Sequence, residues 1–297
     1  MSVSSNLCAP VINSPLRWAG SKKKLLNELL FFFDKRKSVY IEPFLGSGVV
    51  LLNAIKQKLF DKYYVSDVNP GLITFFRMLQ EEPEEIISGT KEISSKYNAL
   101  HDNLDRQIFY NRIRDTYNNG CLRDLDRGVL FWFLMAGGFN GVYRTNSKGL
   151  FNVPYGKKEK IGIDEMHFKE VSSILCGVKF FCLDQKDFFR KIQETVRMSD
   201  CFIYCDPPYI PVSESMKNKT LYTKSEFNHR QFVFDLMRGP VADGSSIVIS
   251  MSASKEADSI YKIMGFSRKG VNDIFRSVNP RKQYKAEEII YLNYDFT

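Results

Sequence analysis

The chain has 297 residues, of which 44% are hydrophobic and 26% are charged, and its formal net charge at pH 7 is +8. At this length a fold buries a core without disulfides or metals, and the six cysteines form no CxxC pair, so a secreted disulfide scaffold is disfavoured. No apolar run reaches the roughly 18 residues that span a bilayer, and residues 1–10 lack the basic start and apolar core of a secretory signal, so we expect a cytoplasmic protein without membrane contact.

Basic residues gather in three stretches of the chain. Seven Lys and Arg stand against two acids in residues 1–41, five against one in 137–163, and eight against three in 255–285. Such a distribution fits a positive face for a polyanion and ordinary solvated surface about equally well.

The first elements form a predicted strand–turn–helix–strand unit. Apolar spacing predicts a helix over 22–33 with Ser21 as its N-cap. The next predicted elements are a strand at 39–41, an apolar helix at 49–55, and a strand at 63–66 that ends at Asp67. This order of elements is typical of a parallel sheet.

The pattern changes from residue 70 to 174, where helical stretches come first. One of them, 127–135, is almost wholly apolar, and a Gly/Asn-rich segment follows at 137–155. Strand signals return at 178–183, 201–205, 246–251 and 288–294. We therefore predict one parallel-sheet unit interrupted by an insertion of roughly 100 residues.

A glycine turn with a distant acid is the first candidate site. Gly46 and Gly48 follow a strand and open a helix, and Asp67 ends the next strand. Such turns let a ligand approach the backbone, while the acid accepts hydrogen bonds from ribose hydroxyls. The pattern indicates an adenosine-containing ligand, although a tight turn with a solvent-facing strand end is an equally good interpretation.

The tetrapeptide at 206–209 (DPPY) is the second candidate site, and by chance it would occur in roughly one chain of this length in 500. An exocyclic amine of adenine or cytosine is a poor nucleophile, because its lone pair is delocalised into the ring. The Asp206 carboxylate and the Pro207 carbonyl can accept its two N–H groups. Tyr209 offers a flat face on which an extruded base can stack.

Five motifs in this order resemble the Dam-type, alpha-class DNA adenine-N6 methyltransferases. They are residues 15–22 (PLRWAGSK), 42–48 (EPFLGSG), 67–70 (DVNP), 139–141 with 151–156 (FNG and FNVPYG), and 206–209 (DPPY), with a looser likeness at 276–290. The resemblance implies an α/β fold: a Rossmann-like seven-stranded S-adenosylmethionine-dependent methyltransferase sheet with an inserted helical/β-hairpin target recognition domain. It divides the chain into a discontinuous catalytic domain, 10–70 with 170–297, and a target recognition domain, 71–169.

The resemblance also assigns roles to individual residues, and no metal is among the implied ligands. The implied cofactor contacts are Trp18, Lys22, Asp67 and Asp206, and the residues that line the cofactor pocket are Phe44, Gly46 and Gly48. The flipped adenine would be bound by Asp206, Pro207 and Tyr209. The implied DNA contacts are Arg17, Phe139, Asn140 and Arg144. The Arg144 fork suits O6 and N7 of guanine. Lys157 is a further candidate for a phosphate contact, or simply a solvated lysine.

Two positions depart from the family pattern. Phe139 stands where the family often has Tyr, which keeps an apolar wedge but loses a hydroxyl, and Ser21 replaces a second glycine. The polar stretch 210–230 is expected to close over the flipped base, or to be a surface loop.

The resemblance implies a site-specific enzyme from a bacterium, phage or virus that methylates N6 of a flipped-out adenine in double-stranded DNA, in the sequence GATC. It leaves room for a cognate restriction endonuclease acting separately, as in restriction-modification. The alternatives are a DNA N4-cytosine methyltransferase, an RNA adenine methyltransferase, a methyltransferase of a protein glutamine side chain, and a catalytically inactive DNA-binding relative.

Overall fold

The structure is a computed structural model that describes residues 10–210, 227–276 and 284–296. Most of the stretch 210–230 and the basic segment 277–283 therefore lie outside the described residues. The elements are η1 (Lys22–Leu25), α1 (Leu26–Phe31), β1 (Val39–Glu42), α2 (Val49–Lys56), β2 (Lys62–Ser66), α3 (Pro70–Glu81), α4 (Pro83–Asn98), α5 (Asn103–Asn119), α6 (Asp124–Gly137), η2 (Phe139–Gly141), α7 (Glu165–Ile174), β3 (Lys179–Phe181), α8 (Gln185–Gln193), η3 (Met198–Asp200), β4 (Cys201–Cys205), α10 (His229–Leu236), η4 (Met237–Val241), β5 (Ser246–Ser252), α11 (Lys255–Tyr261), β6 (Ser267–Arg276) and β7 (Tyr284–Leu292).

A seven-stranded sheet in the order β3-β2-β1-β4-β5-β7-β6 forms the centre of the molecule. The first five strands in this order are parallel, and β7 runs antiparallel between β5 and β6. Every residue of β1, β4 and β5 is buried, as expected for strands with both faces covered. The α/β fold class with a seven-stranded sheet is thus confirmed.

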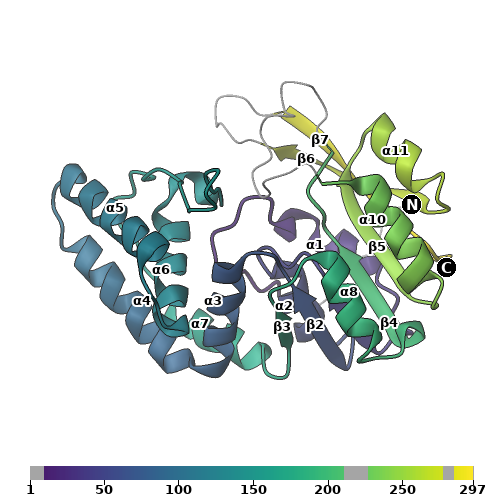
Figure 1. Cartoon of the computed structure of the whole chain (residues 1–297), viewed down its shortest axis with the longest axis horizontal. Helices are drawn as coiled ribbons and strands as arrows, with labels where there is room; N and C mark the ends of the chain where they lie inside the picture. Colours follow the sequence, from purple (N-terminus) through teal and green to yellow (C-terminus); the bar gives the residue numbers. More distant parts are fainter. Residues whose placement is uncertain (1–9, 211–226, 277–283, 297) are drawn as a thin grey trace.

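Alternation along the strands divides the core between the two faces of the sheet. Val39 and Ile41 of β1 pack with the apolar sides of α8, α10 and α11, whereas Tyr40 packs with α1 and α2. In Figure 1, α8, α10 and α11 lie in front of the strands, and the purple α1 lies behind them.

The insertion between β2 and β3 contains α3 to α7 and lies at the left of Figure 1. α6 is its core helix, because Phe131, Trp132 and Phe133 are all buried. Side chains of α3, α4 and α6 belong to the same apolar cluster as those of α1 and α2, so the insertion packs continuously onto the sheet unit. A separate target recognition domain over 71–169 therefore stays a prediction.

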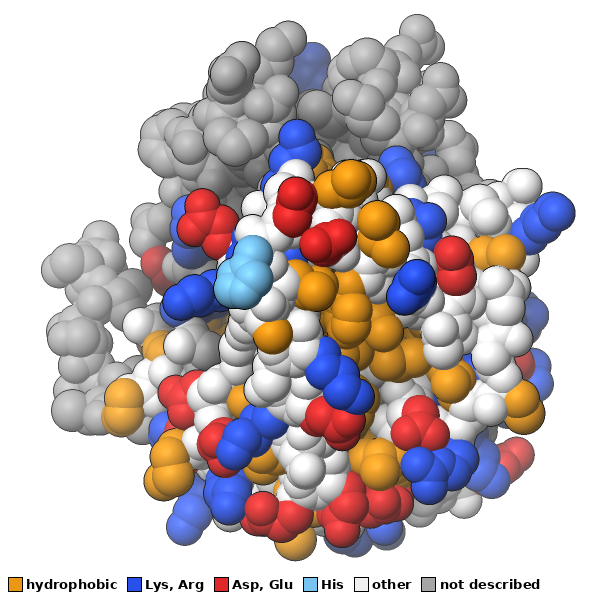
Figure 2. All heavy atoms as spheres, turned by 90° about the vertical axis from the view of Figure 1, so that its left-hand side faces the viewer, with side chains coloured by type: hydrophobic (Ala, Val, Ile, Leu, Met, Phe, Trp, Pro, Cys, Tyr) orange, Lys and Arg blue, Asp and Glu red, His pale blue; other side chains and the backbone are white. Residues whose placement is uncertain are grey.

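Side chains of both charge signs are mixed on the end face of this insertion, with apolar side chains between them (Figure 2). Leu104 and Ile108 of α5, in the same insertion, are 60% and 43% exposed. The surplus of positive charge is therefore not concentrated on this face.

Four local expectations need correction. The helix predicted over 22–33 begins as a 3-10 turn, and Ser21 makes no capping hydrogen bond. The strand predicted over 178–183 is shortened to β3 (Lys179–Phe181). The segment 137–156 holds two isolated bridges, Gly138 to Tyr155 and Thr145 to Phe151, in place of a regular hairpin. Positive φ angles at Asn140, Gly141 and Gly149 interrupt the extended backbone there.

The chain order of the strands reverses between β1 and β4, which are neighbours in the sheet. In open α/β sheets a ligand binds at such a switch point, beyond the carboxyl ends of the strands. Within the described residues, no helix is long and apolar enough to cross a membrane, and no cluster of three or more His, Cys, Asp and Glu is arranged to hold a metal.

Candidate active site

The loops that follow β1 and β2 are joined by the Asp67 carboxylate. Its Oδ2 accepts the backbone N–H of Gly46 at 3.0 Å, and its Oδ1 accepts that of Asn69 at 3.0 Å. Gly46 and Gly48 have φ angles of 49° and 69°, which explains why glycine occupies both positions. Asp67 therefore shapes the glycine turn, and its carboxylate has more acceptor sites than these backbone groups use.

Acidic side chains gather at the carboxyl ends of the parallel strands. Glu42 ends β1, Asp67 follows β2 and Asp206 follows β4. Burial raises the pKa of Glu42 well above its ordinary value, and the charges of Asp206 and Asp67 raise it further. Burial also raises the pKa of Asp67, against the backbone N–H groups that lower it. Burial therefore disfavours the charged forms of Glu42 and Asp67, and a cation bound close to them would favour these charged forms.

Lys22 is the cation that faces these acids. The amine is buried, forms an ion pair with Asp206 Oδ2, and donates to the Gly20 carbonyl at 3.3 Å. Its Nζ also lies 5.0 Å from the centre of the Tyr209 ring. Burial opposes the charged form, yet Asp206 and Tyr209 together outweigh it and hold the pKa of Lys22 above its ordinary value.

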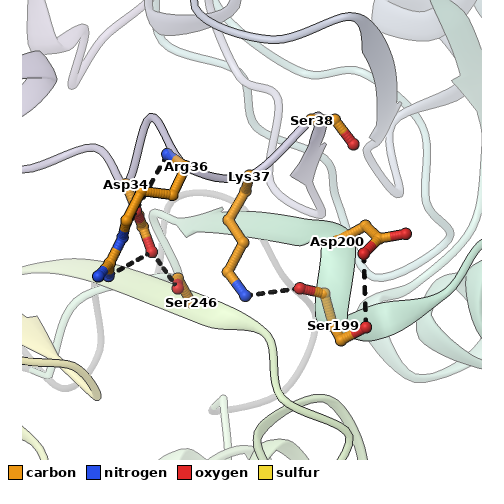
Figure 3. A pocket seen from close by; sticks show the side chains of 7 residues that line it. All are labelled: Asp34, Arg36, Lys37, Ser38, Ser199, Asp200 and Ser246. Carbon is orange, nitrogen blue, oxygen red and sulfur yellow. Dashed lines mark hydrogen bonds and ion pairs between the residues drawn. The ribbon is translucent and has the colours of Figure 1, made fainter.

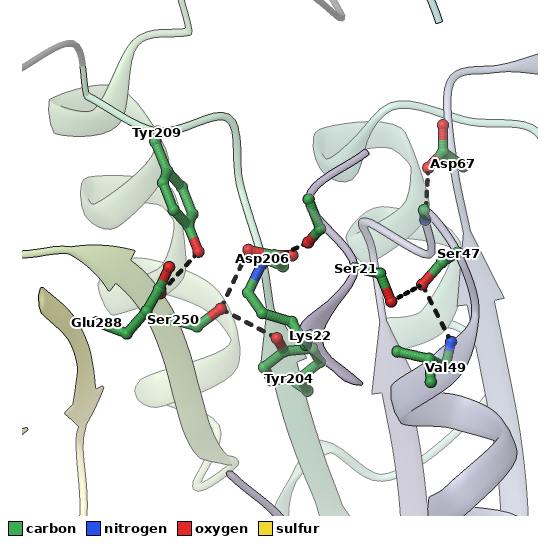
Figure 4. A network of polar contacts seen from close by, with 12 residues as sticks. Ser21, Lys22, Ser47, Val49, Asp67, Tyr204, Asp206, Tyr209, Ser250 and Glu288 are labelled. Carbon is green, nitrogen blue, oxygen red and sulfur yellow. Dashed lines mark hydrogen bonds and ion pairs between the residues drawn. The ribbon is translucent and has the colours of Figure 1, made fainter. Parts of the chain in front are cut away.

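The turn at 206–209 is held by side chains from three other elements. Ser250 of β5 donates to Asp206 Oδ1 at 3.1 Å, and Tyr209 donates to Glu288 Oε2 of β7 at 2.9 Å (Figure 4). His229 of α10 bonds the Pro208 backbone and lies 2.8 Å from the Tyr261 hydroxyl through Nδ1. Burial lowers the pKa of His229 to about 4, so the imidazole is neutral at physiological pH.

Cys205 lies next to Asp206 but is unsuited to act as a nucleophile. The thiol is fully buried, and burial together with Glu42 and Asp206 raises its pKa well above its ordinary value. The thiolate form that would attack a substrate is therefore disfavoured.

The segment around Trp18 binds the loop after α6. Trp18 stacks on Tyr143 with ring centres 6.1 Å apart and an interplanar angle of 16°. Ala19 donates its backbone N–H to the Gly141 carbonyl at 3.0 Å, and Arg17 Nη1 lies 3.5 Å from the Gly138 carbonyl. These contacts bring two motifs together that are about 120 residues apart in the sequence.

Apart from Arg17, the residues predicted to contact DNA lie on the loop after α6 and just after it. Phe139 is 50% exposed, and Asn140 has a φ of 55°. Arg144 is exposed, and its Nε donates to Asn152 Oδ1 at 2.9 Å. Lys157 is exposed as well. Their DNA roles stay predictions.

Phe44 points to the other side of the sheet from the Trp18 segment. Its ring makes edge contacts with Phe227 and Phe232, at 5.7 and 5.6 Å between ring centres. It belongs with the core beneath α10 and α11, and a role in lining the cofactor pocket stays a prediction.

Sequence reasoning missed four residues of this site: Glu42, Ser250, Glu288 and His229. Glu42 carried a readable signal, because an acid ends a buried strand directly before the glycine turn. Glu288 is 1% exposed although the charge of a glutamate normally keeps it at the surface. The contacts of Ser250 and His229 depend on the packing of distant segments and left no local pattern.

A cavity of about 350 Å³ lies at the opposite ends of the parallel strands, by the amino ends of β1, β4 and β5 (Figure 3). Lys37 donates there to the carbonyls of Ser199 and Gly244, while Asp34 binds Arg36 and Ser246. These contacts hold the loops at the amino ends of the strands together. The glycine turn lies at the carboxyl ends, so this cavity is separate from the candidate site.

Comparison with known proteins gives consistent matches. The model of a family described as D12 class N6 adenine-specific DNA methyltransferase matches residues 18–276. A DNA adenine methylase of Haemophilus influenzae is 31% identical over 278 residues, 93% of this chain and 91% of that protein. The type II methyltransferase M.MjaIII of Methanocaldococcus jannaschii is 35% identical, over 72% of this chain and 74% of its own length. A DNA adenine methylase of Vibrio cholerae is 32% identical, over 71% and 70%.

Proposed function

Because this chain belongs to the D12 class of N6 adenine-specific DNA methyltransferases, we propose that it flips an adenine of the sequence GATC out of duplex DNA and methylates it with S-adenosylmethionine. The observation that carries the proposal is the position of Asp206. Its carboxylate lies at the switch point of the sheet and is held from two sides beside the glycine turn.

The residues at the switch point fit S-adenosylmethionine as the methyl donor. When bound, this cofactor supplies a methyl group on a sulfonium that the lone pair of an amine can attack. Asp67 offers spare lone pairs to ribose hydroxyls, and the turn at Gly46 and Gly48 lets a ligand approach the backbone. The acids Glu42, Asp67 and Asp206 favour a positively charged ligand. Trp18, Lys22 and Phe44 complete the proposed cofactor set.

Asp206 and Pro207 prepare the adenine N6 for attack. The carboxylate accepts one N–H of the amine and the Pro207 carbonyl accepts the other, which makes the nitrogen lone pair more available. Tyr209 supplies a face for stacking on the extruded base. No covalent enzyme intermediate is needed, and placing the amine at attack distance accounts for much of the acceleration.

The proposed DNA-reading surface is formed by the loop after α6, which belongs to the proposed target recognition domain 71–169, and by the Trp18 segment, which packs against it. Arg144 binds guanine through its fork, Arg17 contacts a further recognition base, and Lys157 binds a phosphate. Phe139 and Asn140 act on the base stack and fill the gap that the flipped adenine leaves. Extrusion costs a few kcal/mol, which stacking on Tyr209 and filling of the gap offset.

A labelling experiment tests the enzyme, the base and the site together. The purified protein is incubated with tritiated S-adenosylmethionine and two duplexes that differ only in containing or lacking GATC, and the DNA is digested to nucleosides. The proposal predicts label in N6-methyladenine from the GATC duplex alone. Label from both duplexes would discard GATC, label in N4-methylcytosine would discard the base, and no label with DNA still bound would favour an inactive relative.

A further inference from the structure

Ser250 lies between the apolar residues Ile249 and Met251, toward the carboxyl end of the buried strand β5. β5 reads SIVISMS, all seven residues are buried, and Ser250 itself is 3% exposed. A hydroxyl in such a place is costly unless it makes hydrogen bonds. It makes two: one to Asp206 Oδ1 at 3.1 Å and one with the Tyr204 hydroxyl at 3.0 Å (Figure 4).

The direction of these two hydrogen bonds follows from chemistry. An ionised carboxylate only accepts, so the single hydroxyl proton of Ser250 is donated to Asp206. Ser250 must then accept from Tyr204, which is fully buried beneath it on β4. The two hydroxyls form a chain of donors that ends on Asp206, and each bond of such a chain strengthens the next.

The two anchors of Asp206 differ in rigidity. Lys22 reaches Oδ2 with a long side chain from the short 3-10 helix η1. Ser250 reaches Oδ1 with one side-chain bond from a strand that is paired on both sides, with β4 and with β7. Since rotation of a carboxylate about its Cβ–Cγ bond is soft, the anchor on the sheet decides the orientation of the carboxylate plane.

We propose that Ser250 is a positioning residue for the methyl transfer. Its hydroxyl, which accepts a hydrogen bond from Tyr204 and donates one to Asp206, fixes the plane of the Asp206 carboxylate relative to the substrate amine. The inference rests on the proposed function, in which Asp206 accepts an N–H of the amine. Ser250 contacts neither duplex nor cofactor in this account, so it acts on the chemical step and not on substrate binding.

Steady-state and single-turnover kinetics of Ser250→Ala test the proposal. The hydrogen bond to a charged group is lost while the fold is kept, so the single-turnover rate should fall about 10- to 100-fold. The KM values for DNA and S-adenosylmethionine should stay within about twofold. Tyr204→Phe should lower the rate less, and adding it to Ser250→Ala should cause little further loss.

Two further variants separate positioning from general stability. Ser250→Thr retains the hydroxyl and should recover most of the rate. Ser246→Ala is the matched control. Ser246 lies on the same strand and also donates to a carboxylate, Asp34 Oδ2, at 2.6 Å, but it lies at the amino end of the strand, away from Asp206. This control variant should leave the single-turnover rate unchanged, and melting temperatures of all variants verify that they fold.

The outcomes distinguish this inference from the proposed function. An unchanged rate in Ser250→Ala, an equal loss in Ser246→Ala, or a raised KM at constant rate would overturn the role of Ser250 while the wild type still methylates adenine. A wild-type protein that transfers methyl groups to no adenine would overturn the proposed function, and the inference with it.

Discussion

Removal of the Lys22 charge should destabilise the protein far more than removal of a surface lysine. Loss of one partner of a buried ion pair costs about 3–5 kcal/mol, because the other charge stays buried and unpaired. Lys22 is 7% exposed, but Asp206 keeps 22% exposure and some hydration, so about 2 kcal/mol is expected for Lys22→Met from this term. Loss of the cation–π contact with Tyr209 adds about 0.5–1 kcal/mol.

Urea unfolding followed by circular dichroism measures this loss. The matched control is Lys56→Met, since Lys56 pairs with Glu170 at 2.8 Å but the two side chains are 25% and 48% exposed. That variant should lose less than about 0.5 kcal/mol. The double variant Lys22→Met/Asp206→Asn should be more stable than Lys22→Met, because no uncompensated charge remains. A double variant that is less stable than Lys22→Met, or equal losses in the two lysine variants, would show that Lys22→Met leaves no costly unpaired charge on Asp206.

Three further predictions concern His229, Gly48 and Phe139. The pKa of His229 is about 4 in the folded protein and about 6.5 when unfolded, so the unfolded state binds more protons between these values. The contribution of the neutral His229 to the free energy of unfolding is therefore fully present above pH 6.5 and falls by about 3 kcal/mol as the pH drops to 4. Urea unfolding at several pH values should show a smaller loss of stability at low pH for His229→Gln than for the wild type, and an equal loss would contradict this role of His229. Gly48→Ala should cost about 2 kcal/mol, because φ is 69° and the new Cβ would lie 2.9 Å from a ring atom of the core; Gly162→Ala, which meets no atom within 4 Å, should be neutral in the same unfolding assay. Phe139→Ala should change stability by less than about 0.5 kcal/mol, since the ring is half exposed, yet reduce the fluorescence rise of 2-aminopurine at the target position; an unchanged rise would contradict its role in flipping.

The elements around the site were predictable where local sequence controls them. The strand at 201–205 is five apolar or aromatic residues followed by Asp206 and two prolines, and the structure ends β4 at Cys205. The helix after Gly48 begins at Val49, directly after the glycine turn, and its first four residues are apolar. Both patterns depend on neighbours in the chain.

The contacts within the site were not predictable, because they depend on pairing between distant segments. β6 was missed, since its pairing with β7 contains a register shift between Gly270 and Asp273 that disrupts simple alternation. Ser250 meets Asp206, and Glu288 meets Tyr209, only because β5 lies between β4 and β7. Likewise, nothing near Trp18 in the sequence indicates that it stacks on Tyr143.

The rate of methyl transfer by Asp206→Ala shows whether the Asp206 carboxylate accepts the substrate amine. Wild type and variant are compared at saturating S-adenosylmethionine and GATC duplex, with N6-methyladenine as the product measured and circular dichroism as the check of folding. A folded variant should lose at least about a hundredfold in rate, because one acceptor for the amine is gone. Near-normal transfer to adenine N6 by Asp206→Ala would contradict it.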